Sequence, residues 1–133
     1  MAPRKNRILI VEDEAPLRSV LKDNLEIEGF EVMEATNGAD GLKLANKVMP
    51  DLILLDILMP KMDGMTMMEK FRTTKGGARV PIMLLTNVAA DKKIIKSLIK
   101  YMPVYYFDKS SRTIAEIILR VKSRLEMPDE VAV

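Results

Sequence analysis

The sequence predicts an α/β fold: a three-layer, doubly wound (βα)5 arrangement in which helices cover both faces of a parallel sheet. Two observations predict it. Short runs of consecutive apolar residues, typical of strands buried on both faces, alternate with runs whose apolar residues recur at helical spacing. This alternation occurs five times in a chain of 133 residues, which is the usual size of one domain.

The expected strands are short apolar segments bounded by charged residues, glycine or proline. The third ends directly at Asp56, and the fourth has proline at its first position, where a strand tolerates it. In chain order the expected strands are Ile8–Val11, Phe30–Ala35, Leu52–Leu55, Pro81–Leu85 and Val104–Phe107.

The expected helices are recognised by apolar residues three or four positions apart. Gly29 should end the first, Asn37-Gly38 should begin the second, and Pro50 should follow it closely. In chain order their apolar residues are Leu17, Val20, Leu21 and Leu25; Leu42, Ala45 and Val48; Met67, Met68 and Phe71; Ile94, Ile95, Leu98 and Ile99; and Ile114, Ile117, Ile118, Val121 and Leu125.

Composition removes several classes of chemistry. The chain has no Cys and no His, which excludes disulfides, thiol catalysis, Cys-ligated zinc and the commonest general base. No apolar run approaches the roughly 20 residues of a membrane span, and the basic start lacks the apolar stretch of a signal peptide. We expect a cytoplasmic protein with one domain over residues 1–126 and a short tail over residues 127–133.

Polar residues follow four of the expected strands. Glu12-Asp13, Asp56, Thr86-Asn87 and Asp108-Lys109 stand at the strand ends. Because sites in parallel sheets form at the carboxyl ends of strands, we expect these side chains at one edge. Clustered carboxylates repel unless a cation joins them, and an oxygen-only donor set indicates Mg²⁺, or alternatively Mn²⁺. Phosphoryl transfer needs such positioning and charge neutralisation, and a carboxylate can itself be the nucleophile.

Together these residues resemble a known family. Glu12-Asp13, Asp56, Met59-Pro60, Asp63-Gly64, Thr86 and Lys109 resemble the pattern of response regulator receiver domains of two-component signalling, of the chemotaxis-regulator kind. The resemblance runs from about Arg7 to Glu126. It implies a flavodoxin-like sheet with the strand order 2-1-3-4-5.

The resemblance also implies a role for each site residue. Asp56 would accept a phosphoryl group from a phosphohistidine on another protein, so the chain would be a phosphoacceptor signalling domain that catalyses only its own phosphorylation and dephosphorylation. The implied Mg²⁺ ligands are Glu12, Asp13, Asp56 and the backbone carbonyl of Leu58. The implied phosphoryl-binding and switch residues are Thr86, the backbone of Asn87, Lys109 and Tyr106.

The implied partners are proteins. One is a sensor histidine kinase or a histidine phosphotransfer protein. Another is a downstream protein that binds the surface of the fourth helix, fifth strand and fifth helix, and a homodimer on phosphorylation is a further implication. Neither direct nucleic-acid binding nor membrane binding is implied. The chain could be a stand-alone receiver or a fragment of a longer regulator.

Two positions depart from the family pattern. Ser110 follows Lys109 where proline is usual, so a trans peptide bond and a reshaped loop are expected there. Asn87 stands where a small residue is usual, and its amide would crowd the phosphoryl group or bind to it.

Ordinary structural interpretations exist for each site residue. Asp56 could cap a loop, Glu12 and Asp13 could be acids of a first helical turn, and Tyr106 could be plain core. Thr86 could be a strand-end hydroxyl and Lys109 a solvated lysine.

At the level of function, a receiver-like interaction module that no longer phosphorylates is one alternative. A Mg²⁺-dependent phosphohydrolase is another, although it would carry a second acid where Leu58 stands.

Overall fold

The computed structural model describes residues 5–57, 59, 61–86, 96, 100, 105–109 and 113–126. From Arg7 to Thr86 strands and helices alternate as the apolar pattern predicts. The described elements are β1 (Arg7–Val11), α1 (Ala15–Ile27), β2 (Glu31–Ala35), α2 (Gly38–Val48), β3 (Leu52–Leu55), α3 (Gly64–Arg72), β4 (Ile82–Thr86), β5 (Tyr105–Asp108) and α5 (Ile114–Glu126).

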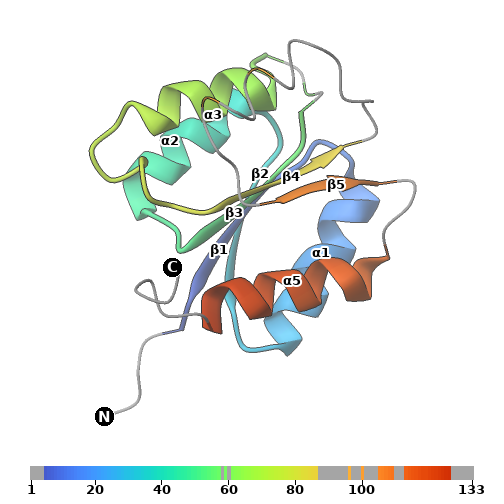
Figure 1. The fold of residues 1–133 in the computed structure, drawn as a ribbon. Coiled ribbons are helices and arrows are strands. Elements are labelled where there is room, and N and C mark those ends of the chain that lie inside the picture. The colour runs from blue at the N-terminus through green and yellow to red at the C-terminus, as the bar shows by residue number, and fades with distance from the viewer. Residues whose placement is uncertain are drawn as a thin grey trace.

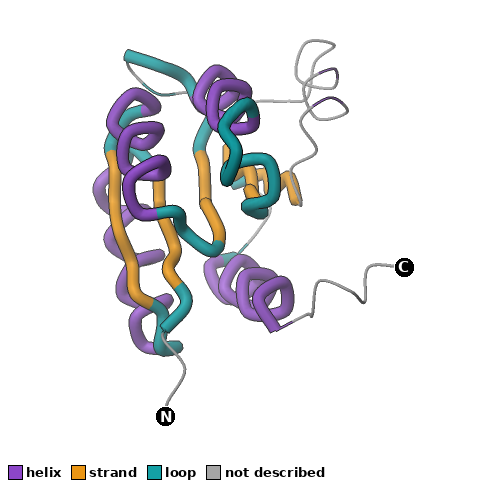
Figure 2. Tube along the Cα trace, turned by 90° about the vertical axis from the view of Figure 1, so that its left-hand side faces the viewer, coloured by secondary structure: helices purple, strands orange, loops and turns teal. Residues whose placement is uncertain are grey.

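The strands form one parallel sheet with β1 and β3 at its centre. The strand order is β2-β1-β3-β4-β5, and every neighbouring pair is parallel. Helices α2 and α3 cover one face and α1 and α5 the other (Figure 1). The perpendicular view shows the same three layers (Figure 2). The predicted α/β class, three-layer architecture and strand order are confirmed.

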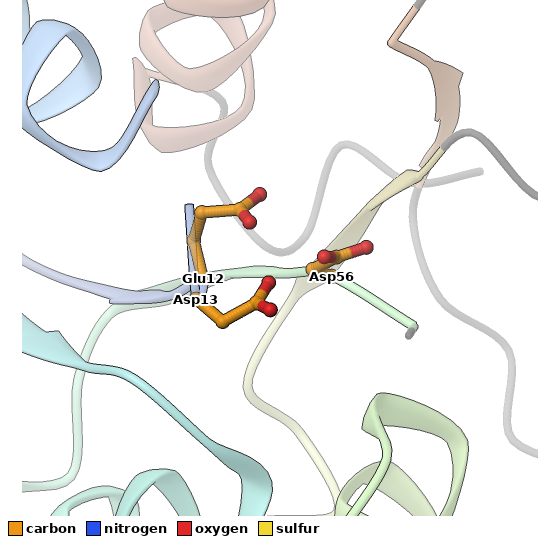
Figure 3. A group of neighbouring side chains, drawn as sticks. All are labelled: Glu12, Asp13 and Asp56. Atoms are coloured by element: carbon orange, nitrogen blue, oxygen red, sulfur yellow. The ribbon is translucent and has the colours of Figure 1, made fainter. Parts of the chain in front are cut away.

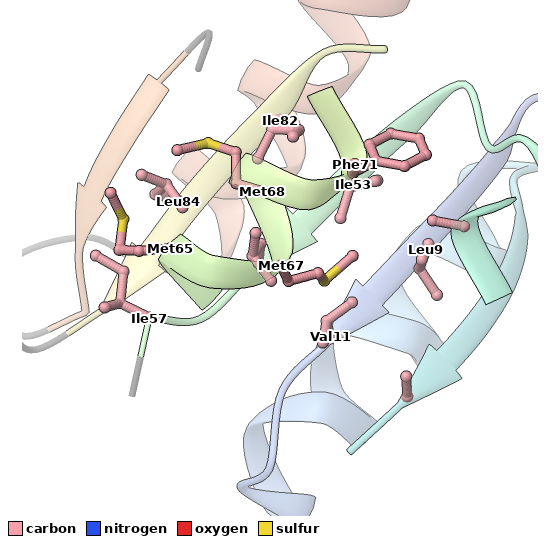
Figure 4. Packing of buried hydrophobic residues seen from close by; sticks show 13 residues of the cluster. Leu9, Val11, Ile53, Ile57, Met65, Met67, Met68, Phe71, Ile82 and Leu84 are labelled. Carbon is pink, nitrogen blue, oxygen red and sulfur yellow. The ribbon is translucent and has the colours of Figure 1, made fainter. Parts of the chain in front are cut away.

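Each face of the sheet has its own hydrophobic core, because successive side chains of a strand point to opposite faces. In β1, Leu9 and Val11 join the core beneath α2 and α3, whereas Ile8 and Ile10 join the core beneath α1 and α5. All four are fully buried, which explains why this strand reads as a continuous apolar run. Met67, Met68 and Phe71 of α3 pack on the first of these faces (Figure 4).

Local signals place the helix ends close to where the sequence predicts them. The Asn37 side chain accepts a hydrogen bond from the Asp40 backbone N–H at 2.9 Å and so caps α2. Gly29 lies just beyond α1 with φ of +96°, a conformation that favours glycine. Five strand boundaries differ by one residue from the prediction, since β1 begins at Arg7, β2 begins at Glu31, β4 spans Ile82–Thr86 and β5 ends at Asp108.

Val20, one of the apolar residues expected in the first helix, lies in α1 as predicted but is not buried. Its exposed fraction is 43%, whereas Leu21 and Leu25 are fully buried. Residues at the edge of a helical stripe lie about as far from the core as from solvent, so spacing alone does not place them.

Several predictions fall outside the described residues. They are the apolar stripe of the fourth helix at Ile94–Ile99, the strand start at Val104, and the tail over residues 127–133. Lys96 and Lys100 are helical and exposed.

Candidate functional site

The predicted site residues lie at the edge of the sheet where the central strands end. Glu12 and Asp13 follow β1, and Asp56 follows β3. The Asp56 N–H donates to the Val11 carbonyl at 3.0 Å, and the Glu12 N–H donates to the Ala35 carbonyl at 3.0 Å. The ladder of backbone hydrogen bonds therefore extends past the strands and fixes both acidic positions against their neighbours.

Three carboxylates meet at this edge (Figure 3). Glu12, Asp13 and Asp56 each place one carboxylate oxygen within 4.8 Å of the other two. Glu12 and Asp56 are buried, with exposed fractions of 1% and 4%, whereas Asp13 is exposed. A buried pair of acids with a third on the solvent side gives an oxygen-only donor set that opens to water. Such a set fits a hard cation such as Mg²⁺, which keeps several of its waters.

Lys109 crosses to this cluster from the end of β5. Its Nζ lies 2.7 Å from Glu12 Oε1, 3.2 Å from Asp56 Oδ2 and 3.1 Å from Glu14 Oε1. The Lys109 side chain is only 9% exposed. The amine that the sequence predicts beside Asp56 is therefore there, in direct contact with it.

Burial and this lysine set the protonation of the two buried acids. Burial raises the pKa of Glu12 to about 7, although the contact with Lys109 opposes the rise. Burial likewise raises the pKa of Asp56 above its ordinary value, again against the attraction of Lys109. For Lys109, burial lowers the pKa, but the contacts with Glu12, Glu14 and Asp56 outweigh it and the net pKa is raised. The lysine thus stays charged, while burial favours the protonated form of both acids.

The loop after β3 explains why Asp63-Gly64 belongs to the pattern. The Asp63 side chain accepts from the Thr66 N–H at 2.8 Å and caps α3. The Gly64 N–H donates to the Ile57 carbonyl at 2.8 Å, and a Cβ on Gly64 would overlap the carbonyl oxygen of Asp56. Glycine at this position lets the start of α3 pack directly against the backbone of the central aspartate.

The turn between β1 and α1 is held by Arg18. Its Nη1 donates to the Glu12 carbonyl at 2.8 Å, and its Nε lies 3.4 Å from Glu34 Oε1 on β2. The backbone that carries the acidic pair is therefore joined to α1 and to the edge strand of the sheet.

The three aromatic residues of β5 divide between the two faces. Tyr106 packs against the core beneath α2 and α3, and Tyr105 packs against the core beneath α1 and α5. Phe107 is buried, and its ring stacks on Tyr105 with 5.7 Å between centroids. Arg120 of α5 lies over the Tyr105 ring at 5.2 Å. Phe107 is therefore part of the hydrophobic core.

Some predicted site residues lie outside the described part of the chain. These are the Leu58 carbonyl, Asn87, the side chain of Thr86 and the peptide bond from Lys109 to Ser110. The Thr86 backbone ends β4 and pairs with Asp108.

Glu14 is the site residue that sequence reasoning missed. It lies in the acidic run after β1, but only the structure shows its carboxylate on the Lys109 amine. Its position next to Asp13 was the one available signal.

Comparison with known proteins settles the family. Residues 8–122 match the family described as the response regulator receiver domain. The chain belongs to this family. It is 31% identical over 128 residues to the DNA-binding dual master transcriptional regulator RpaA of Synechocystis, an alignment that covers 94% of this chain and 51% of that protein.

Solved structures of receiver domains are similar to this chain. A receiver domain protein from Methanospirillum hungatei is 26% identical with a TM-score of 0.83, over 92% of this chain and 95% of that one. The BeF3-activated N-terminal receiver domain of RstA from Klebsiella pneumoniae is 29% identical with a TM-score of 0.79, over 92% of this chain and all of that one.

Membership fixes the class of protein. A receiver domain is a phosphoacceptor signalling module rather than a conventional enzyme, it works with histidine kinases, and the acidic cluster is typical of the family's metal site. The chain spans about half the length of RpaA, a DNA-binding regulator, and less of other curated relatives. In the described part of the chain, no helix is long and apolar enough to cross a membrane.

Proposed function

We propose that this receiver accepts a phosphoryl group on Asp56 from a partner's phosphohistidine in a Mg²⁺-dependent reaction. The observation that carries the proposal is the setting of Asp56: a nearly buried carboxylate flanked by two further acids and touched by the Lys109 amine at 3.2 Å. An aspartate that only caps a loop does not need these neighbouring acids or the lysine. A carboxylate beside both a cation site and a fixed ammonium is suited to carry a phosphoryl group.

In the proposed reaction an oxygen of Asp56 attacks phosphorus. The P–N bond of the phosphohistidine breaks, and the imidazole nitrogen leaves with the electron pair. The incoming group brings negative charge into a cluster that already holds three acids, so neutralisation decides whether the step occurs. Lys109 supplies one positive charge, and we propose that its amine moves from carboxylate to phosphoryl oxygen.

Glu12, Asp13 and Asp56, with the Leu58 carbonyl, would hold the cation. Mg²⁺ bound there would neutralise phosphoryl oxygens as charge develops on them. We further propose that Thr86, the Asn87 backbone and Tyr106 respond to the phosphoryl group. Register supports this for two of them, since Thr86 ends β4 and Tyr106 lies on the adjacent β5.

The output would be a changed surface formed by the fourth helix, β5 and α5. We propose that a downstream protein, or a second copy of this chain after phosphorylation, binds there, and that the phosphoryl donor is a histidine kinase or histidine phosphotransfer protein. The receiver domain would comprise residues 1–126, function in the cytoplasm, and bind neither nucleic acid nor membrane directly.

The test is to incubate the protein with MgCl₂ and acetyl phosphate and to follow its intact mass. We expect one phosphoryl adduct that requires Mg²⁺ and disappears in Asp56→Asn. Asp23→Asn, the same chemical change at an exposed position of α1, is the matched control and should leave the adduct unchanged.

Two outcomes would count against the proposal. An adduct that survives in Asp56→Asn would place the acceptor elsewhere. No adduct in the natural protein, although calorimetry shows Mg²⁺ binding, would favour the interaction module that no longer phosphorylates.

A further inference from the structure

We propose that Glu14 is a positioning residue that holds Lys109 at the site once a cation occupies the acidic cluster. The inference rests on the proposed function and extends it to a residue outside the cation ligands. Its starting point is the ion pair between Lys109 Nζ and Glu14 Oε1, at 3.1 Å.

The N–H donors of Lys109 are the groups that a phosphoryl oxygen would have to bind. A lysine ammonium has three N–H donors, and three carboxylates surround that of Lys109, on Glu12, Glu14 and Asp56, at 2.7 to 3.2 Å. In the cation-free arrangement, hydrogen bonds to Glu14 and Asp56 and the ion pair with Glu12 engage the ammonium. A phosphoryl oxygen can bind Lys109 only after one of these contacts is released.

The three acids around Lys109 differ in what else they can bind. Glu12 and Asp56 belong to the cluster whose oxygens converge within 4.8 Å, together with Asp13. Glu14 is not in that cluster, and its side chain is 56% exposed at the rim. A cation bound by the cluster draws on Glu12 and Asp56 and leaves Glu14 to the lysine.

The backbone of Glu14 is held close to Glu12. The Glu14 backbone N–H donates to Glu12 Oε2 at 3.1 Å, so Glu14 is fixed close to the acid it replaces as partner of the amine. With Glu12 and Asp56 bound to the cation, Glu14 would hold one N–H of Lys109 and leave the other two able to bind a phosphoryl oxygen on Asp56. Without Glu14, the long lysine side chain would lose its remaining tether among the described residues.

The test observes the Lys109 ammonium directly by ¹⁵N NMR, with the signal assigned by its loss in Lys109→Arg. In Glu14→Ala with saturating Mg²⁺, we expect hydrogen exchange of this ammonium to rise roughly two- to fivefold, the scale of one partly exposed ion pair. Without Mg²⁺ the rise should be much smaller, because Glu12 and Asp56 still hold the amine. Glu14→Gln keeps a hydrogen-bond acceptor and should restore slow exchange in part.

Glu28→Ala is the matched control, because it removes the partner of another lysine, Lys122, whose Nζ lies 2.6 Å from Glu28. It should change the Lys122 signal and leave that of Lys109 alone. The proposal is overturned if Lys109 exchange in Glu14→Ala is unchanged with Mg²⁺, or if it rises equally with and without Mg²⁺.

The readout is separate from phosphorylation. A Mg²⁺-dependent change at Lys109 without any adduct on Asp56 would refute the proposed function and leave the role of Glu14 standing. An adduct on Asp56 with no change at Lys109 would support the proposed function and refute the role of Glu14.

Discussion

On the proposed function, protons and Mg²⁺ would compete for Glu12, and this competition would set how Mg²⁺ binding depends on pH. The pKa of Glu12 in the cation-free protein is raised to about 7, chiefly by burial. A carboxylate must be deprotonated to bind the cation, so the apparent dissociation constant is multiplied by one plus the ratio of protonated to deprotonated Glu12. With the pKa at about 7, that factor is about 1.1 at pH 8 and about 11 at pH 6.

Mg²⁺ binding should therefore weaken about tenfold between pH 8 and pH 6, which is about 1.4 kcal/mol. Isothermal titration calorimetry at the two pH values, at constant ionic strength, measures the ratio. Titrations in buffers of different ionisation enthalpy also count protons, and about one should be released at pH 6 and almost none at pH 8.

Two variants make the test specific to Glu12. Glu12→Gln removes the titrating group and should lose the share of the pH dependence that Glu12 causes, leaving the share of Asp56, whose pKa is also raised. Glu26→Gln, an exposed change on α1, should retain the natural behaviour. Equal Mg²⁺ affinity at pH 6 and pH 8 in the natural protein, or an undiminished ratio in Glu12→Gln, would refute the reasoning.

Three further predictions concern stability. Without a cation, the stabilisation from the raised pKa of Glu12 is fully present below about pH 4.5 and is lost as pH rises through about 7, by at most about 3 kcal/mol. The free energies of unfolding of the natural protein and of Glu12→Gln, measured in urea, should therefore be similar at low pH and differ at high pH. Gly64→Ala should lower the free energy of unfolding by about 1–3 kcal/mol, because the new Cβ overlaps the Asp56 carbonyl, while Gly76→Ala, whose Cβ meets only the end of the Met49 side chain, should cost much less. Phe71→Ala should cost about 3–5 kcal/mol by opening a cavity beneath α3, and an unfolding midpoint equal to that of the natural protein would contradict this.

The fold was predictable because both periodicities are pronounced in this sequence. The apolar runs of β1 and β3 are continuous, since both faces of the sheet are covered, and the α5 stripe recurs at helical spacing. Apolar spacing predicts the helix but does not tell which residues at the edge of its stripe are buried, as the exposure of Val20 shows. The positions of Glu12 and Asp56 followed from strand ends, because parallel strands end at one edge.

The different environments of Glu12 and Asp13 could have been predicted from the alternation of side chains along a strand. Glu12 continues the backbone ladder of β1 and has the same parity as Ile8 and Ile10, which face inward beneath α1 and α5. Asp13 has the opposite parity and follows the end of the ladder. Adjacent acids thus become one buried and one exposed carboxylate, which the residue types alone do not distinguish.

The contact between Glu14 and Lys109 could not be derived in this way. It joins residues 95 positions apart through two long side chains, at a point where one strand has already turned into a helix. Which rotamers meet there depends on the whole edge of the sheet, including the lysine's other acids. On the proposed function, Glu12 and Asp56 would have a second partner in the cation, whereas Glu14 lies outside the acidic cluster. The acid that sequence reasoning had least cause to notice is therefore the one whose hold on Lys109 should survive cation binding.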